Sequence, residues 1–287
     1  MKLWNIIKRK GSKMSGILHL VATPIGNLGD ITLRAIDILK EVDLIAAEDN
    51  RQTLKLLNHL EISKPLITYH RHNEETVAPK IIEKLLEGQN VAVCTDAGTP
   101  GISDPGETVT KLAIEKGIQV ISIPGACALI NALVASGLDT NEFSFYAFLP
   151  LNNKLRKAKF EEMLKDQKTI VFYEAPHRIK ETLEEMLKVF GDRQIVVAKE
   201  LTKIHETFYR GSISKVKAEF DSIKDVKGEF VVLVEGIKIE EENELNKLSL
   251  EEHFSFYKNN GLDKKEIIKK IAKDRGVNKN EIYKHFV

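Results

Sequence analysis

The sequence predicts an α/β protein of two domains followed by a helical C-terminal tail. The first domain is expected to contain a parallel sheet and the second a mixed one. Over residues 15–137, apolar runs of strand length alternate with amphipathic helical patterns. This alternation is typical of a parallel sheet that is covered by helices on both faces. Over residues 138–238, five strand-like runs are separated by only two strong helical patterns, which favours a mixed sheet. The hydrophobic content of 43% and charged content of 30% are those of an ordinary soluble globular protein.

The N-terminal domain is expected to contain five strands, each a short apolar run, at residues 17–23, 43–48, 65–70, 90–95 and 118–123. A helix is expected after each strand, at residues 31–42, 51–60, 77–88, 107–117 and 126–137. We expect Asp30 to cap the first helix and Gly88 to end the third. The charge-free run from Ile118 to Leu138 has the length of a membrane span. Because Pro124-Gly125 splits it into a strand and a helix, we interpret it as buried core.

The second domain is expected to contain strands at residues 143–150, 168–176, 193–201, 206–213 and 228–236. Its two expected helices cover residues 154–166 and 179–191. The last three strands follow one another closely, and short connections favour antiparallel neighbours. We therefore expect this sheet to be partly antiparallel.

The two ends of the chain are more basic than its body, although the net charge is only +1. Residues 1–14 hold five Lys or Arg and no acidic residue, and we expect them to be an appendage. Seven glutamates lie within residues 235–252, and nine Lys or Arg face four acidic residues within 258–287. We therefore interpret residues 239–287 as an acidic linker and a basic helical tail. Basic ends indicate either solvated charge or a polyanionic partner.

The tail is expected to form two helices joined by a tight turn. Asp263 can cap the first helix and Gly276 can end it, and Asn278 with Glu281 resembles a capping box for the second. The apolar seam of the pair is expected to consist of Ile267, Ile268, Ile271, Ile282, Tyr283 and Phe286. Such a pair is either a small packing module or a nucleic-acid-binding helix-turn-helix.

The cysteine content limits the class of protein. Cys94 and Cys127 are the only cysteines, and both lie in apolar segments without the spacing of metal ligands. This excludes a disulfide scaffold and a zinc cluster, and it fits a reducing compartment. The N-terminus has no apolar core of a signal peptide. We expect a cytoplasmic protein without a membrane segment.

The loops after the strands are the expected ligand sites, because ligands of open parallel sheets bind at the carboxyl ends of the strands. Loop 23–30 matches neither the dinucleotide fingerprint nor the P-loop, so it is either a tight turn or a backbone platform for a ligand. Loop 47–53 carries Glu48, Asp49 and Arg51, either as surface charges or as groups facing the cleft. Loop 68–75, with two histidines around Arg71, suits a phosphate or a base better than a metal.

The segment VCTDAGTPGISDPG, residues 93–106, has the most unusual composition. Asp96 follows a buried strand directly, and Gly98 and Gly101 permit close approach of a ligand to the backbone. The prolines restrict the movement of the loop. A loop without lysine does not suit phosphate, so we expect a flat or neutral-polar ligand here. Pro124-Gly125 at the next loop also permits close approach.

Six motifs give the sequence a specific resemblance: HLVATPIGNLGDITLRA, AAEDNRQT, CTDAGTPGISDPG, IPGACALINALVASG, FYEAPHRI and AKELTKIHET. Together they resemble the tetrapyrrole-methylase superfamily of S-adenosylmethionine enzymes over residues 16–287. Within it, they are similar to the branch that methylates a ribose 2′-oxygen of a cytidine in small-subunit (16S) ribosomal RNA. The resemblance implies a homodimer that acts on this RNA or on the assembled subunit, with S-adenosylmethionine in the cleft between its two domains.

The resemblance also implies a set of cofactor-binding residues from both domains. They are Pro24, Asp96, Gly98, Thr99, Pro100, Gly101, Ile102, Ser103, Asp104, Cys127, Ala128, Tyr173, Glu174, Ala198 and Thr202. The branch usually has Pro-Gly-Pro-Ser where residues 124–127 are Pro-Gly-Ala-Cys. Cys127 therefore lacks the hydroxyl that the serine of the branch offers, and we expect only a backbone contact with the cofactor at this position.

Methyl transfer to a ribose hydroxyl requires a positioned acceptor and a route for its proton. The catalytic candidates follow strands of the second domain. Glu200 is expected to be the base or to orient Lys199, and Arg178 is expected to hold a phosphate. His177 is either a cleft residue or a helix-start residue, while His205 and Glu206 are weaker candidates because HETF resembles a strand edge.

Two other functions are compatible with parts of the sequence. A methylase of a corrin or sirohaem precursor would bind a bulky tetracarboxylate and would give the basic tail no role. A ribosome-binding module without catalysis would not bind S-adenosylmethionine, and it would leave residues 96–104 unexplained.

Overall fold

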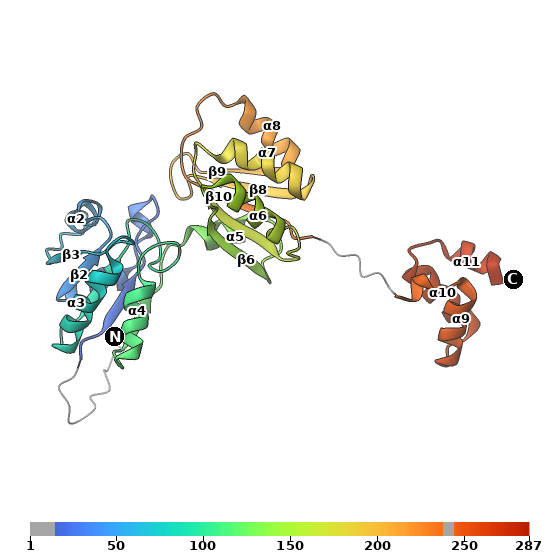
Figure 1. Ribbon diagram of the computed structural model, residues 1–287, viewed down its shortest axis with the longest axis horizontal. Helices are drawn as coiled ribbons and strands as arrows, with labels where there is room; N and C mark the ends of the chain where they lie inside the picture. Colours follow the sequence, from blue (N-terminus) through green and yellow to red (C-terminus); the bar gives the residue numbers. More distant parts are fainter. Residues whose placement is uncertain (1–14, 238–243, 287) are drawn as a thin grey trace. The chain divides into compact units, whose positions relative to one another are not determined.

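A computed structural model describes residues 15–237 and 244–286 of the chain (Figure 1). The chain divides into two compact units on either side of Ile237. The first unit contains two β-sheets, and the second contains only helices. The basic appendage expected at residues 1–14 and the first part of the expected acidic linker, residues 239–243, lie outside the described residues.

The first sheet is parallel throughout and has the strand order β3-β2-β4-β1-β5. Its strands are β1 (Leu18–Val21), β2 (Leu44–Ala47), β3 (Leu66–Thr68), β4 (Val91–Cys94) and β5 (Val120–Ile123). Helices α1 (Leu33–Glu41) and α2 (Asn50–His59) pack on one face, and α3 (Glu74–Leu86) and α4 (Glu107–Glu115) pack on the other. The prediction of a parallel sheet covered on both faces is confirmed.

The start of α1 differs from the prediction that Asp30 caps it. Residues Leu28–Asp30 form a short 3-10 helix, whose cap is Asn27. The chain then runs extended to Thr32, and the Thr32 hydroxyl accepts a hydrogen bond from the Ala35 N–H. Asp30 is therefore not the cap, because an additional turn separates it from the helix.

The second sheet is mixed, with the strand order β6-β7-β10-β8-β9. Its strands are β6 (Phe143–Phe148), β7 (Thr169–Glu174), β8 (Gln194–Lys199), β9 (Thr207–Ser212) and β10 (Phe230–Val234). Strands β6 and β7 are parallel, while β10 is antiparallel to β7 and β8, and β8 is antiparallel to β9. The predicted mixed sheet and the antiparallel pairing of its last strands are confirmed.

Four helices pack on the second sheet. Helices α6 (Asn153–Met163), α7 (Ile179–Phe190) and α8 (Ile213–Ser222) cover one face. Helix α8 was not predicted from the sequence; it follows β9 without a loop because Ser212 is both the last strand residue and the helix cap. Figure 1 shows α7 and α8 side by side above the sheet.

Helix α5 (Ala128–Ser136) covers the other face of the second sheet. Its residues Leu129 and Leu133 pack against Val196 and Val231, although the sequence places the helix directly after the last strand of the first sheet. Arg210 of β9 also donates hydrogen bonds to the carbonyl oxygens of residues 135 and 136, at the end of the helix. The loop that leads into α5 therefore runs from the first sheet to the second.

The second unit consists of η2 (Glu244–Lys247), α9 (Leu250–Asn259), α10 (Lys264–Asp274) and α11 (Lys279–Phe286). The predicted cap at Asp263 is confirmed, with Glu266 completing a capping box, and Gly276 at φ +63° follows α10 as expected. Asn278 accepts a hydrogen bond from the Asn280 N–H. The unit has its own buried core of Tyr257, Ile267, Ile268, Ile271, Ala272 and Ile282.

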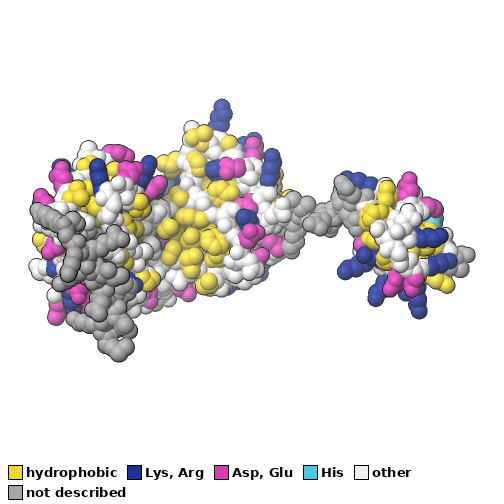
Figure 2. Space-filling model, turned by 90° about the horizontal axis from the view of Figure 1, so that it is seen from below, with side chains coloured by type: hydrophobic (Ala, Val, Ile, Leu, Met, Phe, Trp, Pro, Cys, Tyr) yellow, Lys and Arg dark blue, Asp and Glu magenta, His cyan; other side chains and the backbone are white. Residues whose placement is uncertain are grey.

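The surface of the second unit is rich in Lys and Arg side chains, which appear dark blue in Figure 2. Tyr283 lies on this surface and is 51% exposed, so its predicted place in the apolar seam is wrong. Within the described parts of the chain, no helix is both long and apolar enough to cross a membrane. The run from Ile118 to Leu138 is split into β5 and α5, as predicted.

Candidate functional site

A pocket of about 410 Å³ lies in the first unit, where the carboxyl end of the first sheet meets the second sheet. From the first sheet it is lined by Ile25, Glu48 and the loop after β4. From the other side it is lined by the start of α5, the end of β7 and the start of β10. The loops after the parallel strands therefore form one wall, as open sheets of this type predict.

The loop after β4 is held from two sides by hydrogen bonds. On one side, Gly98 and Thr23 form an isolated antiparallel bridge. On the other side, the Asp96 N–H donates to Glu48 Oε2 at 3.2 Å, and the Asp49 N–H donates to Asp96 Oδ1 at 3.1 Å. Gly98 has φ +90°, a conformation that glycine adopts without steric cost. The loop is therefore fixed in place before any ligand binds.

Ser103 of this loop combines a strained backbone with a hydroxyl that has no partner in the described part of the chain. It has φ +65°, which is costly for a residue with a side chain, and its buried hydroxyl has no hydrogen-bond partner in the structure. The Arg71 guanidinium donates a hydrogen bond to its carbonyl oxygen. Strained residues and unsatisfied buried polar atoms are concentrated at functional sites. The Ser103 hydroxyl is thus available to a ligand in the pocket.

The lining of the pocket is acidic, although Arg178 and Lys203 pair with two of its carboxylates, Glu174 and Glu229. The lining includes Glu48, Asp96, Asp104, Glu174 and Glu229 but no Lys, Arg or His. Burial, together with the nearby carboxylates of Glu48 and Asp96, raises the pKa of Asp104 to about 6, against the opposing influence of Arg71. Burial also raises the pKa values of Glu48 and Asp96. These carboxylates would attract a cationic ligand and repel a phosphate.

The opposite wall is aromatic. The Tyr173 ring packs edge-on against Phe145 and Phe148, with centroid distances of 5.1 Å and 5.5 Å. Its hydroxyl accepts a hydrogen bond from the Leu129 N–H at 3.2 Å. Burial raises the pKa of Tyr173 well above its usual value, so the phenol is neutral. The pocket thus combines an apolar wall with an acidic one.

Ten of the residues expected to bind the cofactor line this pocket, namely Asp96, Gly98, Thr99, Ile102, Ser103, Asp104, Cys127, Ala128, Tyr173 and Glu174. Pro100 and Gly101 lie instead along a shallow groove beside α4. Pro24, Ala198 and Thr202 are not among the lining residues. Ala198 is fully buried beneath α5, and Thr202 lies in a left-handed turn. The binding roles of all these residues remain predictions.

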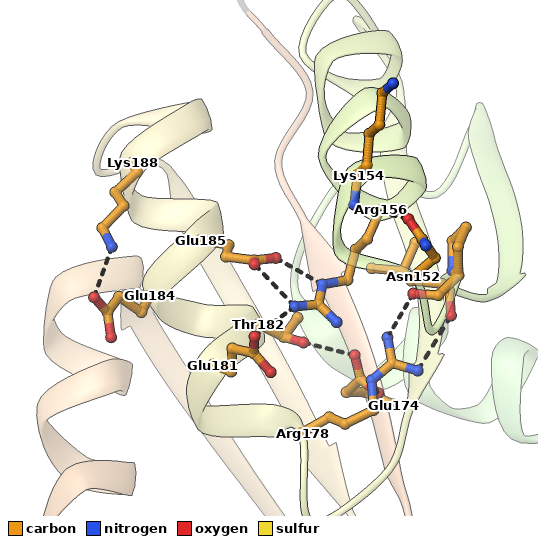
Figure 3. Close-up of polar contacts among 12 residues, drawn as sticks. Asn152, Lys154, Arg156, Glu174, Arg178, Glu181, Thr182, Glu184, Glu185 and Lys188 are labelled. Carbon is orange, nitrogen blue, oxygen red and sulfur yellow. Dashed lines mark hydrogen bonds and ion pairs between the residues drawn. The ribbon is translucent and has the colours of Figure 1, made fainter.

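Glu174 and Arg178 have structural partners (Figure 3). The buried Glu174 carboxylate accepts hydrogen bonds from the Thr182 hydroxyl at 2.7 Å and the Ala175 N–H at 2.8 Å. The Arg178 side chain is 8% exposed and donates to the carbonyl oxygens of residues 149 and 150. It also lies 3.4 Å from Glu174. This burial does not favour the expected contact of Arg178 with a phosphate.

Glu200 and Lys199 lie at the end of β8 but do not line the pocket. Lys203 Nζ and the Glu229 N–H both donate to Glu200 Oε1 at 2.9 Å. Burial alone would raise the pKa of Glu200, but these hydrogen bonds outweigh it and hold the pKa below its usual value. A carboxylate in this state is a weak base. The structure thus pairs Glu200 with Lys203, and not with Lys199.

Strand alternation gives the face of β8 on which Lys199 lies, but it does not account for its absence from the pocket lining, because its partner Phe230 shares that face and lines the pocket. Ala198 and Val196 of β8 face α5, while Val197 faces the helices on the opposite side of the sheet. Because successive side chains of a strand point to opposite faces, Lys199 shares the face of Val197. The other candidates are placed differently. His177 is exposed and follows the pocket residue Pro176, whereas Glu206 accepts a hydrogen bond from the Thr202 N–H.

Part of the pocket lining was not predicted from the sequence. These residues are Ile25, Ala97, Phe148, Ala175, Pro176, Leu201, Gly228, Glu229, Phe230 and Val231. Gly228 stands two residues before a strongly apolar strand, which is the pattern of a close backbone approach. Apart from the acidic Glu229, the other positions carry ordinary apolar residues, and only the packing of the two sheets brings them to the pocket.

Comparison with known proteins identifies the family. Residues 17–217 match the family described as Tetrapyrrole (Corrin/Porphyrin) Methylases. This chain belongs to the tetrapyrrole methylase family. As a member of it, the chain is a methyltransferase, and its acidic pocket lies where both halves of the tetrapyrrole methylase fold contribute residues.

Curated relatives match nearly the whole chain. The chain is 49% identical over 271 residues to the ribosomal RNA small subunit methyltransferase I of Halalkalibacterium halodurans, and the matched region covers 93% of each chain. It is 49% identical over 277 residues to the protein of the same name from Bacillus subtilis, covering 95% of this chain and 94% of that one. The Synechocystis protein of this name is 43% identical, covering 93% of this chain and 96% of that one.

Solved structures of other tetrapyrrole methylases share the fold at low sequence identity. The methyltransferase CobJ superposes with a TM-score of 0.58 at 16% identity, covering 78% of this chain and 97% of that one. A uroporphyrin-III C-methyltransferase from Thermus thermophilus, complexed with S-adenosyl homocysteine, has a TM-score of 0.54 at 19% identity, covering 76% of this chain and 97% of that one. These similarities establish the fold and not the substrate.

Proposed function

We propose that this chain transfers a methyl group from S-adenosylmethionine to a ribose 2′-oxygen of a cytidine in small-subunit (16S) ribosomal RNA. The observation that carries the proposal is the 49% identity, over 93% of both chains, to a relative named ribosomal RNA small subunit methyltransferase I. The choice of the ribose oxygen and of cytidine follows from the motif resemblance alone. Either the naked RNA or the assembled small subunit is the acceptor.

We place S-adenosylmethionine in the pocket between the two sheets. The carboxylates of Glu48, Asp96 and Asp104 suit a ligand that carries a positive sulfonium and an ammonium group. The unpartnered Ser103 hydroxyl would satisfy one polar group of the ligand, and Gly98 allows backbone contact. When bound, the cofactor supplies a methyl group on a positively charged sulfur.

The chain itself must orient the acceptor hydroxyl and provide for its proton. Orientation supplies much of the rate in a displacement of this kind, because the reacting atoms must lie in line. Neither Lys199 nor Glu200 lines the pocket, so a proton-accepting role for either requires contact with an RNA bound at its rim. The position of both residues outside the pocket lining does not favour these two roles, and separate substitutions test them.

A tetrapyrrole acceptor would give the lysine-rich surface of the second unit no role. The curated relatives that are 43% to 49% identical to this chain are named ribosomal RNA methyltransferases, which also favours RNA as the acceptor. A binding module without catalysis would leave the strained Ser103 and the acidic pocket without a role.

The test is methyl transfer from labelled S-adenosylmethionine to three acceptors offered separately: small ribosomal subunits, naked 16S RNA and a tetrapyrrole tetracarboxylate. Both RNA acceptors should come from cells that lack this methylation. We expect label in RNA, and nuclease digestion should release it as 2′-O-methylcytidine. Label in the tetrapyrrole alone, or cofactor binding without transfer to any acceptor, would overturn the proposal.

We further propose that the protein is a homodimer of the cytoplasm. Exposed apolar side chains on α5, Ile130 and Val134, support a protein interface, since they lie one turn apart on one side of the helix. Figure 2 shows hydrophobic side chains gathered on a face of the second α/β part. Light scattering of the purified chain should give twice the monomer mass of 32.4 kDa.

A further inference from the structure

The acidic side chains of the second unit are largely engaged in its own structure. Glu252 and Glu266 complete capping boxes at the starts of α9 and α10. Asp263 caps α10, and Asp274 accepts a hydrogen bond from the Tyr257 hydroxyl. Glu251 pairs with a histidine of α11 at 2.6 Å. These carboxylates therefore have partners other than the neighbouring lysines.

Three lysines of α10 form a row whose positive charge is not paired with any of these carboxylates. Lys265, Lys269 and Lys273 follow one another at intervals of four residues, which places them along one side of the helix. All three are exposed, and in the described part of the chain their ammonium groups make no hydrogen bond or ion pair. The row lies away from the buried side of α10, which is formed by residues such as Ile267 and Ile271.

Helix α11 adds further groups of the same kind. It follows α10 after a turn of four residues, 275–278, so the pair has the order of a helix-turn-helix. Lys279 and Tyr283 lie one turn apart on its exposed side, and Lys284 follows. An exposed tyrosine can stack on an unpaired base, while lysines bind phosphate.

We infer that the lysine row of α10 (Lys265, Lys269 and Lys273), together with Lys279 and Tyr283 of α11, is a binding surface for RNA. The inference rests on the proposed function, because it assigns part of the RNA affinity to the second unit. The row binds the phosphate backbone, and Tyr283 stacks on a base that is not paired. The free positive charge and the exposed ring together favour a structured RNA with unpaired nucleotides over an acidic protein.

The test compares two triple variants of the full chain. Lys265→Gln/Lys269→Gln/Lys273→Gln removes the row while keeping helix-forming residues. The matched control, Lys40→Gln/Lys80→Gln/Lys116→Gln, removes three exposed lysines of the first unit. Lys40 and Lys116 stand at the ends of α1 and α4, at the edge of the sheet opposite the pocket. Circular dichroism and calorimetry with S-adenosylmethionine confirm that both variants keep their fold and their cofactor site.

Binding to 16S RNA is then measured over a range of salt concentrations. Loss of three phosphate contacts should reduce the slope of log K against log salt by about 2 to 3 and weaken binding at least tenfold at about 0.1 M salt. The control should keep the wild-type slope. A separate Tyr283→Ala variant should lose about fivefold or more in affinity with the slope unchanged, because stacking releases no counterions.

The outcomes separate this inference from the proposed function. If the wild-type chain methylates the RNA and the α10 triple variant keeps both its slope and its affinity, the lysine row does not bind RNA and the function stands. If the wild-type chain neither binds nor methylates small-subunit RNA, the proposed function fails and the inference fails with it. An equal loss in the α10 variant and the control would indicate only general charge attraction, and would also overturn the inference.

Discussion

Thr23 and Gly98 exchange two backbone hydrogen bonds: the Thr23 N–H donates to the Gly98 oxygen at 2.9 Å, and the Gly98 N–H donates to the Thr23 oxygen at 3.0 Å. The pair joins the loop after β1 to the loop after β4. Because Gly98 lines the pocket with φ +90°, the shape of the acidic wall depends on this bridge.

Gly98→Ala should weaken cofactor binding more than it weakens the fold. The new Cβ would lie 3.5 Å from Ile25, an ordinary contact, so the main cost is the left-handed backbone, about 1 kcal/mol. Gly117→Ala is the matched control, since Gly117 has φ +68° and no atom within 4 Å of an added Cβ. Urea unfolding should show similar losses for both. Calorimetry should show at least a tenfold loss of S-adenosylmethionine affinity for Gly98→Ala alone; equal affinities would contradict the proposed cofactor site.

Asp104 should make cofactor binding dependent on pH. Its pKa of about 6 means that the carboxyl loses its negative charge as the pH falls through that value. The affinity for a cationic cofactor should therefore fall between pH 7 and pH 5. Asp104→Asn should bind more weakly at pH 7 and should lose most of this pH dependence. Glu48 and Asp96 have pKa values raised in the same direction, so a smaller dependence should remain.

The same carboxyl should have the opposite effect on stability. Between pH 3.8 and about 6, the folded chain holds a proton on Asp104 that the unfolded chain has lost, so this contribution to stability falls as pH rises. Without ligand at pH 7, Asp104→Asn should raise the free energy of unfolding by about 1 kcal/mol, after allowance for solvent screening. Urea unfolding at several pH values checks this prediction. A destabilised variant at pH 7 would indicate that Asp104 supports the fold instead.

Arg156 should tolerate replacement better than its partners do. Its guanidinium is 2% exposed and pairs at 2.7 Å with both Glu181 and Glu185, which are 53% and 26% exposed (Figure 3). Glu181→Gln/Glu185→Gln leaves a buried cation without a counter-charge, which should cost about 3 to 5 kcal/mol. Arg156→Met leaves two carboxylates that can reach water and should cost about 1 to 2 kcal/mol. Urea unfolding measures the loss in the free energy of unfolding for both variants. A larger loss for Arg156→Met than for the double glutamine variant would show that packing of the arginine stem dominates.

Glu200→Gln should affect stability and not methyl transfer. The carboxylate accepts hydrogen bonds from Lys203 and from the Glu229 N–H, so its loss should cost about 1 kcal/mol. At saturating cofactor and RNA, we expect the kcat of Glu200→Gln to stay within about threefold of the wild-type value, because the group does not line the pocket. The kcat of Lys199→Ala should likewise stay within about threefold of the wild-type value, because Lys199 does not line the pocket either. A loss of kcat of a hundredfold at unchanged stability would restore either residue as a catalytic candidate.

The sequence predicted those features that depend on local pattern. The strands of the first sheet are short apolar runs bounded by polar loops, and the loop around Asp96 and Gly98 has a composition that ordinary turns do not require. The exception at α1 is instructive. Asp30 and Thr32 are both good caps, but Asp30 is the last residue of the 3-10 turn Leu28–Asp30, so Thr32 is the residue that caps the helix.

Long-range packing could not be predicted in the same way. Helix α5 follows the first sheet in sequence, but its apolar residues face the second sheet, because the sequence does not say which neighbour covers an apolar helix face. For the same reason, Val231 and Phe148 gave no sign that they line a pocket. Lys199 was placed beside the site by its position in the chain, but its side chain does not line the pocket, although its partner Phe230 on the same face of the sheet does.

The strand order β3-β2-β4-β1-β5 places β4 between β2 and β1. As a result, the loop after β4 is bonded on one flank to Thr23 and on the other to Glu48 and Asp49. A substitution in any one of these three loops must be accommodated by the other two. Their residues should therefore have changed in concert during evolution, and an alignment of relatives should show covariation among positions that lie more than twenty residues apart in the chain.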